Sequence, residues 1–454
     1  MSIKENYRYS IYLIFSLILT RIISYYYLNI TIDEKWIFGL WQHLRLEYLQ
    51  NNLLQSLLYF HAQPPLWNFI LGIGVKISSF IKLDVFINLI NFLTTLLIIY
   101  SSYHLLKNLN FNRIQRYFLI LFLIILSPSI LFYENFPSYA HFTCLLLFLI
   151  KLNFLKIYKK FKNKYEFQIY LYSSMVILTW SAYLIYFNII IFILLLPLIM
   201  NKKRILKSFL IFLMFFIIGM TPSIKNKFLF DIFLNSSWSG LNAAQATGYD
   251  RENWPLCSFT TDNLRAYNST YKDILNNKDY LNNDIFNDNT FNDLGYIYKS
   301  TKCHNDAKVH LIKNFYSITK QKIARFFSVH AHLSIDFAFK PKNWVNHFST
   351  LEKMNYNDLF KIIIISFFGL NYIFYMAMVL INLRDRNKKI LNYFLIINLI
   401  LYLYLLFVSF YGSTWEQERM RYTGYSFIFI STCLIIKRLF LQKEFKYIKF
   451  KTIN

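Results

Sequence analysis

The chain has 454 residues, of which 56% are hydrophobic, 20% aromatic and only 16% charged, and its formal net charge is +25. An apolar content this high excludes a single soluble domain and is typical of an integral membrane protein. The basic residues fall in short clusters between apolar runs. That distribution is typical of cytoplasmic loops under the positive-inside rule, and it does not predict nucleic-acid binding.

Apolar runs follow one another along the chain, and a spanning helix needs about 20 mostly apolar residues. The run 65–82 is short and contains Gly72, Gly74 and Lys76, so we expect a short, tilted or re-entrant segment there. With this run not spanning, the basic clusters all fall on the cytoplasmic side together with the N-terminus. We expect spans near 9–29, 84–104, 117–133, 138–157, 169–183, 184–200, 208–222, 358–382, 390–411 and 426–441.

These runs predict an all-α polytopic membrane protein of about ten to eleven transmembrane helices, with an inserted non-cytoplasmic polar domain. The expected parts are an N-terminal transmembrane module (1–222), the polar domain (223–357), and C-terminal transmembrane helices with a short basic cytoplasmic tail (358–454). Cys257 and Cys303 lie in the polar domain and can form a disulfide if it faces an oxidising compartment.

The stretch TIDEKWIFGLWQHLRLEYLQNNLLQSLLYFHAQPPLW, residues 31–67, places charged residues, histidines and a double proline beside the first apolar run. Asp33 and Glu34 open it, and such a pair by itself is most often a helix N-cap with a first-turn acid. Residues 41–60 carry large apolar side chains at helical spacing with polar ones between them. This pattern predicts an amphipathic helix in the membrane interface.

The same stretch closes on His61 and on the pair Pro64-Pro65. A lone histidine in this setting is more often a hydrogen-bonded interfacial residue than a catalyst, and a proline pair is typical of a helix start. An interfacial helix between the acidic pair and the prolines would carry the chain along one membrane face. Such a helix can bring the two ends of the stretch, the acidic pair and the prolines, to the same cleft.

The order of these elements resembles the GT-C superfamily of membrane glycosyltransferases, particularly protein O-mannosyltransferases and bacterial aminoarabinose or lipopolysaccharide-sugar transferases. ILSPSILFYENFPSYAHF, at 125–142, is similar to the family's Ser-Pro helix and its short external turn. Family members commonly have the histidine directly before the prolines, whereas Ala62 and Gln63 intervene here. The matching residues are Asp33, Glu34, His61, Pro64, Pro65, Leu66 and Trp67.

The resemblance implies inverting transfer of a sugar from a polyprenyl-phosphate donor to an acceptor hydroxyl on the non-cytoplasmic face. Module 1–222 would be catalytic, with its active-site loop at 30–67. This chemistry needs a carboxylate that deprotonates the acceptor and cations that stabilise the leaving phosphate. The resemblance implies Asp33 as the base with Glu34 supporting it, although either carboxylate can point into a cleft.

For the donor phosphate the sequence offers Arg419 and Arg421 in WEQERMRY, and Lys225 and Lys227 just past the run 208–222. A salt-bridged external loop explains WEQERMRY about equally well. The predicted substrate-binding residues are His61, Glu134 and Trp67. Glu134 lies in YENFPSY, whose composition by itself is that of an ordinary turn.

No metal and no other cofactor is predicted. His330 and His332 in VHAHLSID lack a third ligand at recognisable spacing, and some members of the superfamily use a divalent cation whereas the most similar ones do not. The expected partners are the polyprenyl-phosphate sugar, an acceptor that the sequence does not identify, and membrane lipids, without nucleic acid. The expected location is a bacterial inner membrane with the site facing the periplasm or exterior, or the endoplasmic reticulum with the site facing the lumen.

Three other functions fit a polytopic chain. A non-catalytic membrane scaffold explains the external domain and the basic loops, but it gives no reason for an acidic pair and a His/Pro-Pro element on either side of one interfacial helix. A membrane polysaccharide polymerase or ligase depends on external arginines and a histidine rather than on Asp33. A lipid-sugar transporter or flippase is expected to show broken helices in corresponding positions of two halves, and the sequence shows no such symmetry.

Overall fold

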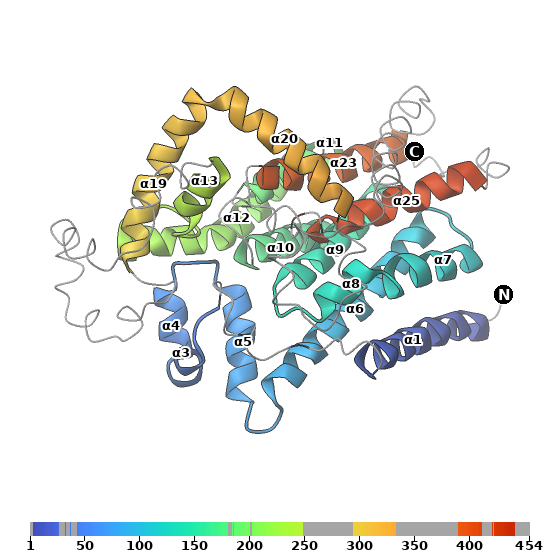
Figure 1. Ribbon diagram of the computed structural model, residues 1–454. Helices are drawn as coiled ribbons and strands as arrows, with labels where there is room; N and C mark the ends of the chain where they lie inside the picture. The colour runs from blue at the N-terminus through green and yellow to red at the C-terminus, as the bar shows by residue number, and fades with distance from the viewer. Residues whose placement is uncertain are drawn as a thin grey trace.

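The computed structural model describes residues 3–26, 32, 37, 43–179, 184, 186–199, 202–247, 294–332, 389–410, 420 and 422–440. Every regular element within these ranges is a helix, so the predicted all-α class is confirmed for the described part of the chain (Figure 1). The helices are α1 (Ile3–Tyr26), α3 (Leu46–Asn51), α4 (Leu53–Tyr59), α5 (Leu66–Lys76), α6 (Leu83–Asn108), α7 (Arg113–Ile120), η1 (Leu121–Ile125), α8 (Pro128–Glu134), α9 (Ala140–Lys159), α10 (Asn163–Thr179), α11 (Phe187–Ile199), α12 (Lys202–Phe230), α13 (Ser239–Thr247), α19 (Leu294–Lys313), α20 (Phe315–His332), α23 (Lys389–Phe410) and α25 (Tyr425–Phe440).

Helix α9 is the centre of the bundle, where it contacts α6, α8, α10, α23 and α25. Of the 18 most apolar consecutive residues of α9, 83% are buried. Helix α12 packs on α10 and α11, and only 33% of its corresponding 18 residues are buried. The outer faces of α1 and α12 instead expose large apolar side chains, including Phe15, Leu210 and Ile217. Apolar surface of this extent must be covered by lipid or by another protein.

Among the described residues, three helices are long and apolar enough to cross a bilayer: Leu83–Asn108, Ala140–Lys159 and Arg204–Phe230. Five shorter apolar helices accompany them: Ile11–Tyr26, Leu66–Lys76, Phe187–Ile199, Asn392–Leu405 and Tyr425–Lys437. All eight coincide with apolar runs noted in the sequence. The predicted span 358–382 lies outside the described residues.

The run 117–133, predicted as a span, is not one uninterrupted helix, because the helix breaks before Pro128. Helix α7 passes into the π-helical turn η1, and α8 then starts at Pro128. Ser127 is extended, with φ −67° and ψ 120°, and its Oγ accepts a hydrogen bond from the Ile130 amide at 3.4 Å. A residue before proline is disfavoured in the helical region, and serine is a good N-cap, so both residues favour a break here.

The predicted single amphipathic helix at 41–60 is also wrong, because it is split into α3 and α4. The break falls at Asn52, whose φ of −132° and ψ of 53° are not helical. Asparagine competes with the helix by forming local non-helical hydrogen bonds, which makes it a poor residue for a helix interior. The two short helices fold beside α5 (Figure 1).

Helix α5 confirms the prediction of a short segment that begins at the proline pair. Pro65 is its N-cap, and its 11 residues extend for only about 16 Å, against about 30 Å for the hydrocarbon core. Two glycines allow its close packing. A Cβ atom at Gly72 would lie 2.2 Å from the Leu53 side chain, and one at Gly74 would lie 2.5 Å from the Phe86 ring.

Four helices from distant parts of the chain share one end of the bundle. Helices α3, α4, α13 and α19 lie together at the left of Figure 1, whereas the N-terminus and α7 lie at the right. Helix α13 packs along α19. Cys303 in α19 is buried and forms a disulfide whose partner lies outside the described residues.

Candidate functional site

The loop between α4 and α5 is bound to the loop between α12 and α13. His61 is fully buried, its carbonyl accepts a hydrogen bond from the Ser237 amide at 2.9 Å, and its Nδ1 lies 2.8 Å from Ser237 Oγ. The edge of the imidazole packs on Phe230, with ring centroids 5.1 Å apart. The Ser236 hydroxyl donates to the Ala62 carbonyl. These contacts join residues about 175 positions apart into one polar junction, which we call the His61–Ser237 junction.

The loop that follows α12 is directed toward this junction by the end of the helix. Asp231 has a left-handed φ of 56°, which terminates the helix, and aspartate tolerates this conformation better than most residues. Asn226 Nδ2 then donates to the Leu234 carbonyl at 2.8 Å, and the Ser223 hydroxyl donates to Asn235 Oδ1. The loop is thereby held against the last turns of its own helix.

Lys225 joins the junction from α12. Its side chain is partly buried, and its ammonium group donates to the carbonyl of Phe60, the residue before His61. No carboxylate of the described residues forms an ion pair with it. Lys227, two positions later, differs in both respects, because it is 53% exposed and pairs with Asp231.

Three polar side-chain atoms on the segments that meet at the junction are buried and have no hydrogen-bond partner among the described residues. They are Gln63 Oε1, Asn226 Oδ1 and Asn235 Nδ2. Buried polar atoms are nearly always paired, so unpaired ones in a cluster indicate a place where a polar ligand or solvent can bind. The junction therefore combines a cation with both acceptor and donor groups.

His43 and Trp67 form a second polar contact beside the junction. The Trp67 indole N–H donates to His43 Nε2 at 3.1 Å, and His43 Nδ1 contacts the Ile37 carbonyl. This geometry requires the neutral imidazole with its proton on Nδ1. Burial lowers the pKa of His43 to about 4, against the opposing effect of the Ile37 carbonyl. Trp67 is itself only 2% exposed, so its indole packs inside the protein.

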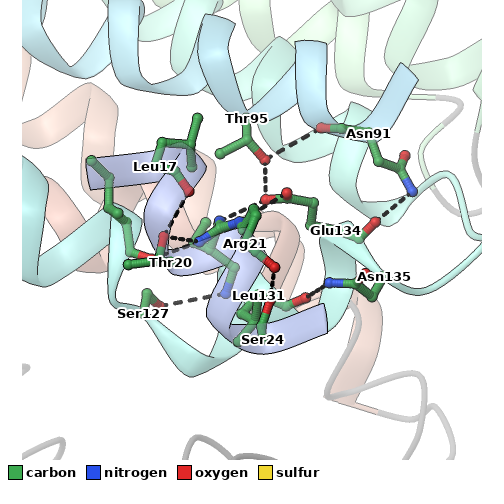
Figure 2. Close-up of polar contacts among 12 residues, drawn as sticks. Leu17, Thr20, Arg21, Ser24, Asn91, Thr95, Ser127, Leu131, Glu134 and Asn135 are labelled. Carbon is green, nitrogen blue, oxygen red and sulfur yellow. Dashed lines mark hydrogen bonds and ion pairs between the residues drawn. The ribbon is translucent and has the colours of Figure 1, made fainter. Parts of the chain in front are cut away.

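Glu134 lies in a separate cluster, where it is bound on both oxygens (Figure 2). Arg21 donates from Nε to Oε1 at 2.9 Å and from Nη2 to Oε2 at 2.6 Å. The Thr95 hydroxyl donates to Oε2 at 2.6 Å, and Asn91 Nδ2 donates to the Glu134 carbonyl at 2.8 Å. The carboxylate is therefore already neutralised and hydrogen-bonded within the protein.

The structure brings some of the predicted site residues together and separates others. Lys225 and His61 meet at the same loop, and Trp67 begins the helix that follows it, whereas Glu134 belongs to the Arg21 cluster. Their predicted roles toward substrate stay predictions. The predicted base and its neighbour, Asp33 and Glu34, and the predicted phosphate ligands Arg419 and Arg421 lie outside the described residues.

Sequence reasoning missed several residues that organise these clusters, notably Arg21, Thr95, His141 and Ser237. For Arg21 a signal was present, because an arginine within an apolar run is costly in lipid and so indicates an internal partner. Thr95 and Ser237 carried no such signal. Their importance depends on which helices become neighbours.

Within the described residues every regular element is a helix, and three of these helices are long and apolar enough to cross a bilayer, which indicates an integral membrane protein. Comparisons with protein-family models and with curated proteins find no match for this chain. Among solved structures it is similar to ArnT from Cupriavidus metallidurans in the apo state, with 12% sequence identity, a TM-score of 0.36, and coverage of 93% of this chain and 77% of that chain. This identity and this TM-score are too low to assign a fold family or a reaction.

Proposed function

We propose that the protein is a GT-C-type membrane glycosyltransferase that transfers a sugar from a polyprenyl-phosphate donor to an acceptor hydroxyl with inversion, on the non-cytoplasmic face. The observation that carries the proposal is Lys225. Its ammonium group lies at the His61–Ser237 junction and has no carboxylate partner among the described residues. A partly buried charge of this kind is stabilised when an anion binds beside it.

The depth of Lys225 suits a lipid phosphate. It lies five residues before the end of α12 at Phe230, which corresponds to about 8 Å along the helix axis. A polyprenyl chain can remain among the bilayer lipids at this depth while its phosphate reaches the ammonium group. The unpaired atoms of Gln63, Asn226 and Asn235, on the segments that meet at the junction, provide hydrogen-bonding groups for a sugar or a phosphate.

The remaining roles follow the resemblance. Asp33 acts as the general base with Glu34 beside it, and Arg419 and Arg421 share the phosphate with Lys225. His61 and Trp67, which flank Pro64-Pro65, are the substrate-binding residues on the loop between α4 and α5 and at the start of α5. The Cys303 disulfide supports the assigned face, since disulfides persist in oxidising compartments, and α13, which directly follows the junction, packs on the helix that bears this cysteine.

The test uses the full chain in lipid nanodiscs with a panel of polyprenyl-phosphate sugars, and it follows release of the polyprenyl phosphate. Wild type is expected to consume one donor. Lys225→Gln should lower kcat/KM by about 10- to 1000-fold, since it removes a cation at the leaving group. Lys227→Gln, on the same helix and exposed, should leave the rate unchanged. Equal effects of the two variants would remove Lys225 from the site.

The general base is tested in the same assay. Asp33→Asn should lose at least about 100-fold in rate while donor binding persists, as expected for a proton acceptor. If Asp33→Asn is fully active and only the arginine variants are impaired, a polysaccharide polymerase or ligase is favoured instead. If no donor is consumed in nanodiscs but lipid-linked sugar crosses the membrane once the protein is reconstituted into vesicles, the protein is a flippase.

A further inference from the structure

Helix α7, which lies at the end of the bundle away from α3 and α4 (Figure 1), carries a buried arginine. Arg116 is 7% exposed, and its guanidinium carbon lies 4.4 Å from the centre of the Tyr103 ring. Its Nε donates to the Asn112 carbonyl at 3.3 Å, whereas its Nη1 is buried and has no hydrogen-bond partner among the described residues. Leaving a buried donor of a charged group unpaired is costly, so Nη1 indicates a place where an acceptor can bind.

Further basic side chains lie around Arg116. Lys107 in the last turn of α6, Arg116 in α7, and Lys156 in the last turn of α9 are all close enough to His104 for their charges to act on its ring. None of these three cations forms an ion pair with a carboxylate of the described residues. Glu166, at the start of α10, interacts with α12 instead. Cations gathered without counter-charges favour the binding of an anion.

The usual structural role for basic side chains at this position is already filled by another residue. Lysines and arginines near the C-terminus of a helix commonly bind its last carbonyl groups. At α6 this is done by Lys437 of α25, whose ammonium group donates to the Leu109 carbonyl at 3.2 Å and to the Asn110 carbonyl at 2.8 Å. Capping of α6 therefore does not explain Lys107 and Arg116.

The outer face of α6 continues from these basic residues as an apolar stripe. Residues three or four positions apart lie on one face of a helix, and here they are, in chain order, Leu89, Leu93, Leu97, Tyr100, His104 and Lys107. The first four, which we call the α6 stripe, are apolar or aromatic side chains that are each 45% to 55% exposed. An acyl chain can lie along the α6 stripe while a phosphate group reaches His104 and Lys107. A free phosphate ion would make no use of the stripe.

We propose that Arg116, Lys107, Lys156 and His104 bind the phosphate group of an anionic membrane lipid whose acyl chain lies along the α6 stripe. These lysines and this arginine belong to the basic clusters that we expect on the cytoplasmic side, where anionic lipids are abundant and where basic pockets between helices bind their head groups. The inference does not rest on the proposed glycosyl transfer, because it uses no residue of the His61–Ser237 junction.

Native mass spectrometry of the full chain in detergent tests the site, because it counts bound lipids and gives the apparent Kd of the first one. With phosphatidylglycerol as the probe, Arg116→Gln should raise this Kd about tenfold, the effect of one charge-assisted hydrogen bond. The matched control is Arg204→Gln in α12, which removes another arginine placed over an aromatic ring, 5.3 Å from the centre of Phe161, and should raise the Kd less than about twofold. Equal increases would indicate diffuse electrostatic attraction and overturn the site.

A second variant keeps the test decisive if Arg116→Gln fails to fold. Lys107→Gln changes an exposed side chain and should raise the Kd for phosphatidylglycerol about fivefold, as expected for one basic residue beside an anionic head group. An unchanged Kd in Lys107→Gln and in Lys156→Gln would show that no head group lies between α6 and α9, and the proposal would be wrong.

Two further probes separate an anionic lipid from other occupants. Phosphatidylcholine, whose head group has no net charge, should bind at least tenfold more weakly than phosphatidylglycerol. Glycerol phosphate, which has the head-group charge without acyl chains, should also bind at least tenfold more weakly. Equal affinity for phosphatidylcholine would reject recognition of negative charge, and equal affinity for glycerol phosphate would assign the site to a soluble phosphate and overturn the lipid.

Discussion

Arg21 and Glu134 are 113 positions apart in the chain and form a bidentate ion pair inside the bundle, with distances of 2.9 Å and 2.6 Å. Their side chains are only 13% and 6% exposed. A pair with this geometry joins the first helix to the end of α8. Unlike a surface ion pair, it is therefore expected to be costly to break by removing one partner, because the other charge is then left buried and unpaired.

Removing one partner of this ion pair should destabilise the protein, because the other charge is left buried without a counter-charge. Glu134→Leu leaves a largely dehydrated guanidinium without its carboxylate, and we expect a loss of about 3–5 kcal/mol in the free energy of unfolding. The measurement is an SDS titration in mixed micelles. The double variant Arg21→Met/Glu134→Leu should recover most of the loss. The exposed pair provides the control, since Lys227→Gln should cost no more than about 0.5 kcal/mol.

The His61–Ser237 junction should depend on a single hydroxyl group. Ser237→Ala removes the hydroxyl that contacts the fully buried His61, and we expect a loss of about 1–3 kcal/mol in the same titration. Ser102→Ala is the control, because Ser102 Oγ is buried and has no partner among the described residues. Similar losses for both variants would show that the junction contributes no specific stability.

The stability of the protein should fall between pH 6.5 and pH 4 partly because of His43. Its pKa is lowered from 6.5 to about 4 by burial, so the unfolded state binds more protons than the folded state within this window. Stability therefore rises with pH across the window and is lost as the pH falls through it. His43→Gln keeps an acceptor for Trp67 and does not titrate. Thermal unfolding midpoints at pH 7.5 and pH 5 should differ less in this variant than in wild type, and equal differences would contradict the assignment.

The close contact of α5 with α6 should tolerate no added methyl group at Gly74. A Cβ atom would lie 2.5 Å and 2.7 Å from two atoms of the Phe86 ring, and we expect Gly74→Ala to cost about 1–3 kcal/mol through overpacking. Phe86→Leu should relieve the clash in the double variant. If the second substitution adds its own cost instead of restoring stability, α5 and α6 are not packed at this position.

Sequence reasoning located the apolar helices well and their interruptions poorly. Long apolar runs predict helices because a chain in lipid must satisfy its backbone hydrogen bonds internally, and α6, α9 and α12 follow that rule. The breaks at Asn52 and before Pro128 depend on one or two residues each. Hydropathy averages over many residues, so a single asparagine or a Ser-Pro pair is lost in it.

The candidate site divides in the same way. His61, Lys225 and Glu134 stand out by residue type and by their order in the sequence. The sequence by itself determined that polar and charged side chains lie beside or within apolar helices. Only the tertiary structure decided their partners, because a hydrogen bond between residues such as His61 and Ser237 requires an approach within about 3 Å. The distance between these two residues is set by how α4, α5, α12 and α13 pack, and it cannot be predicted from a local pattern of residues.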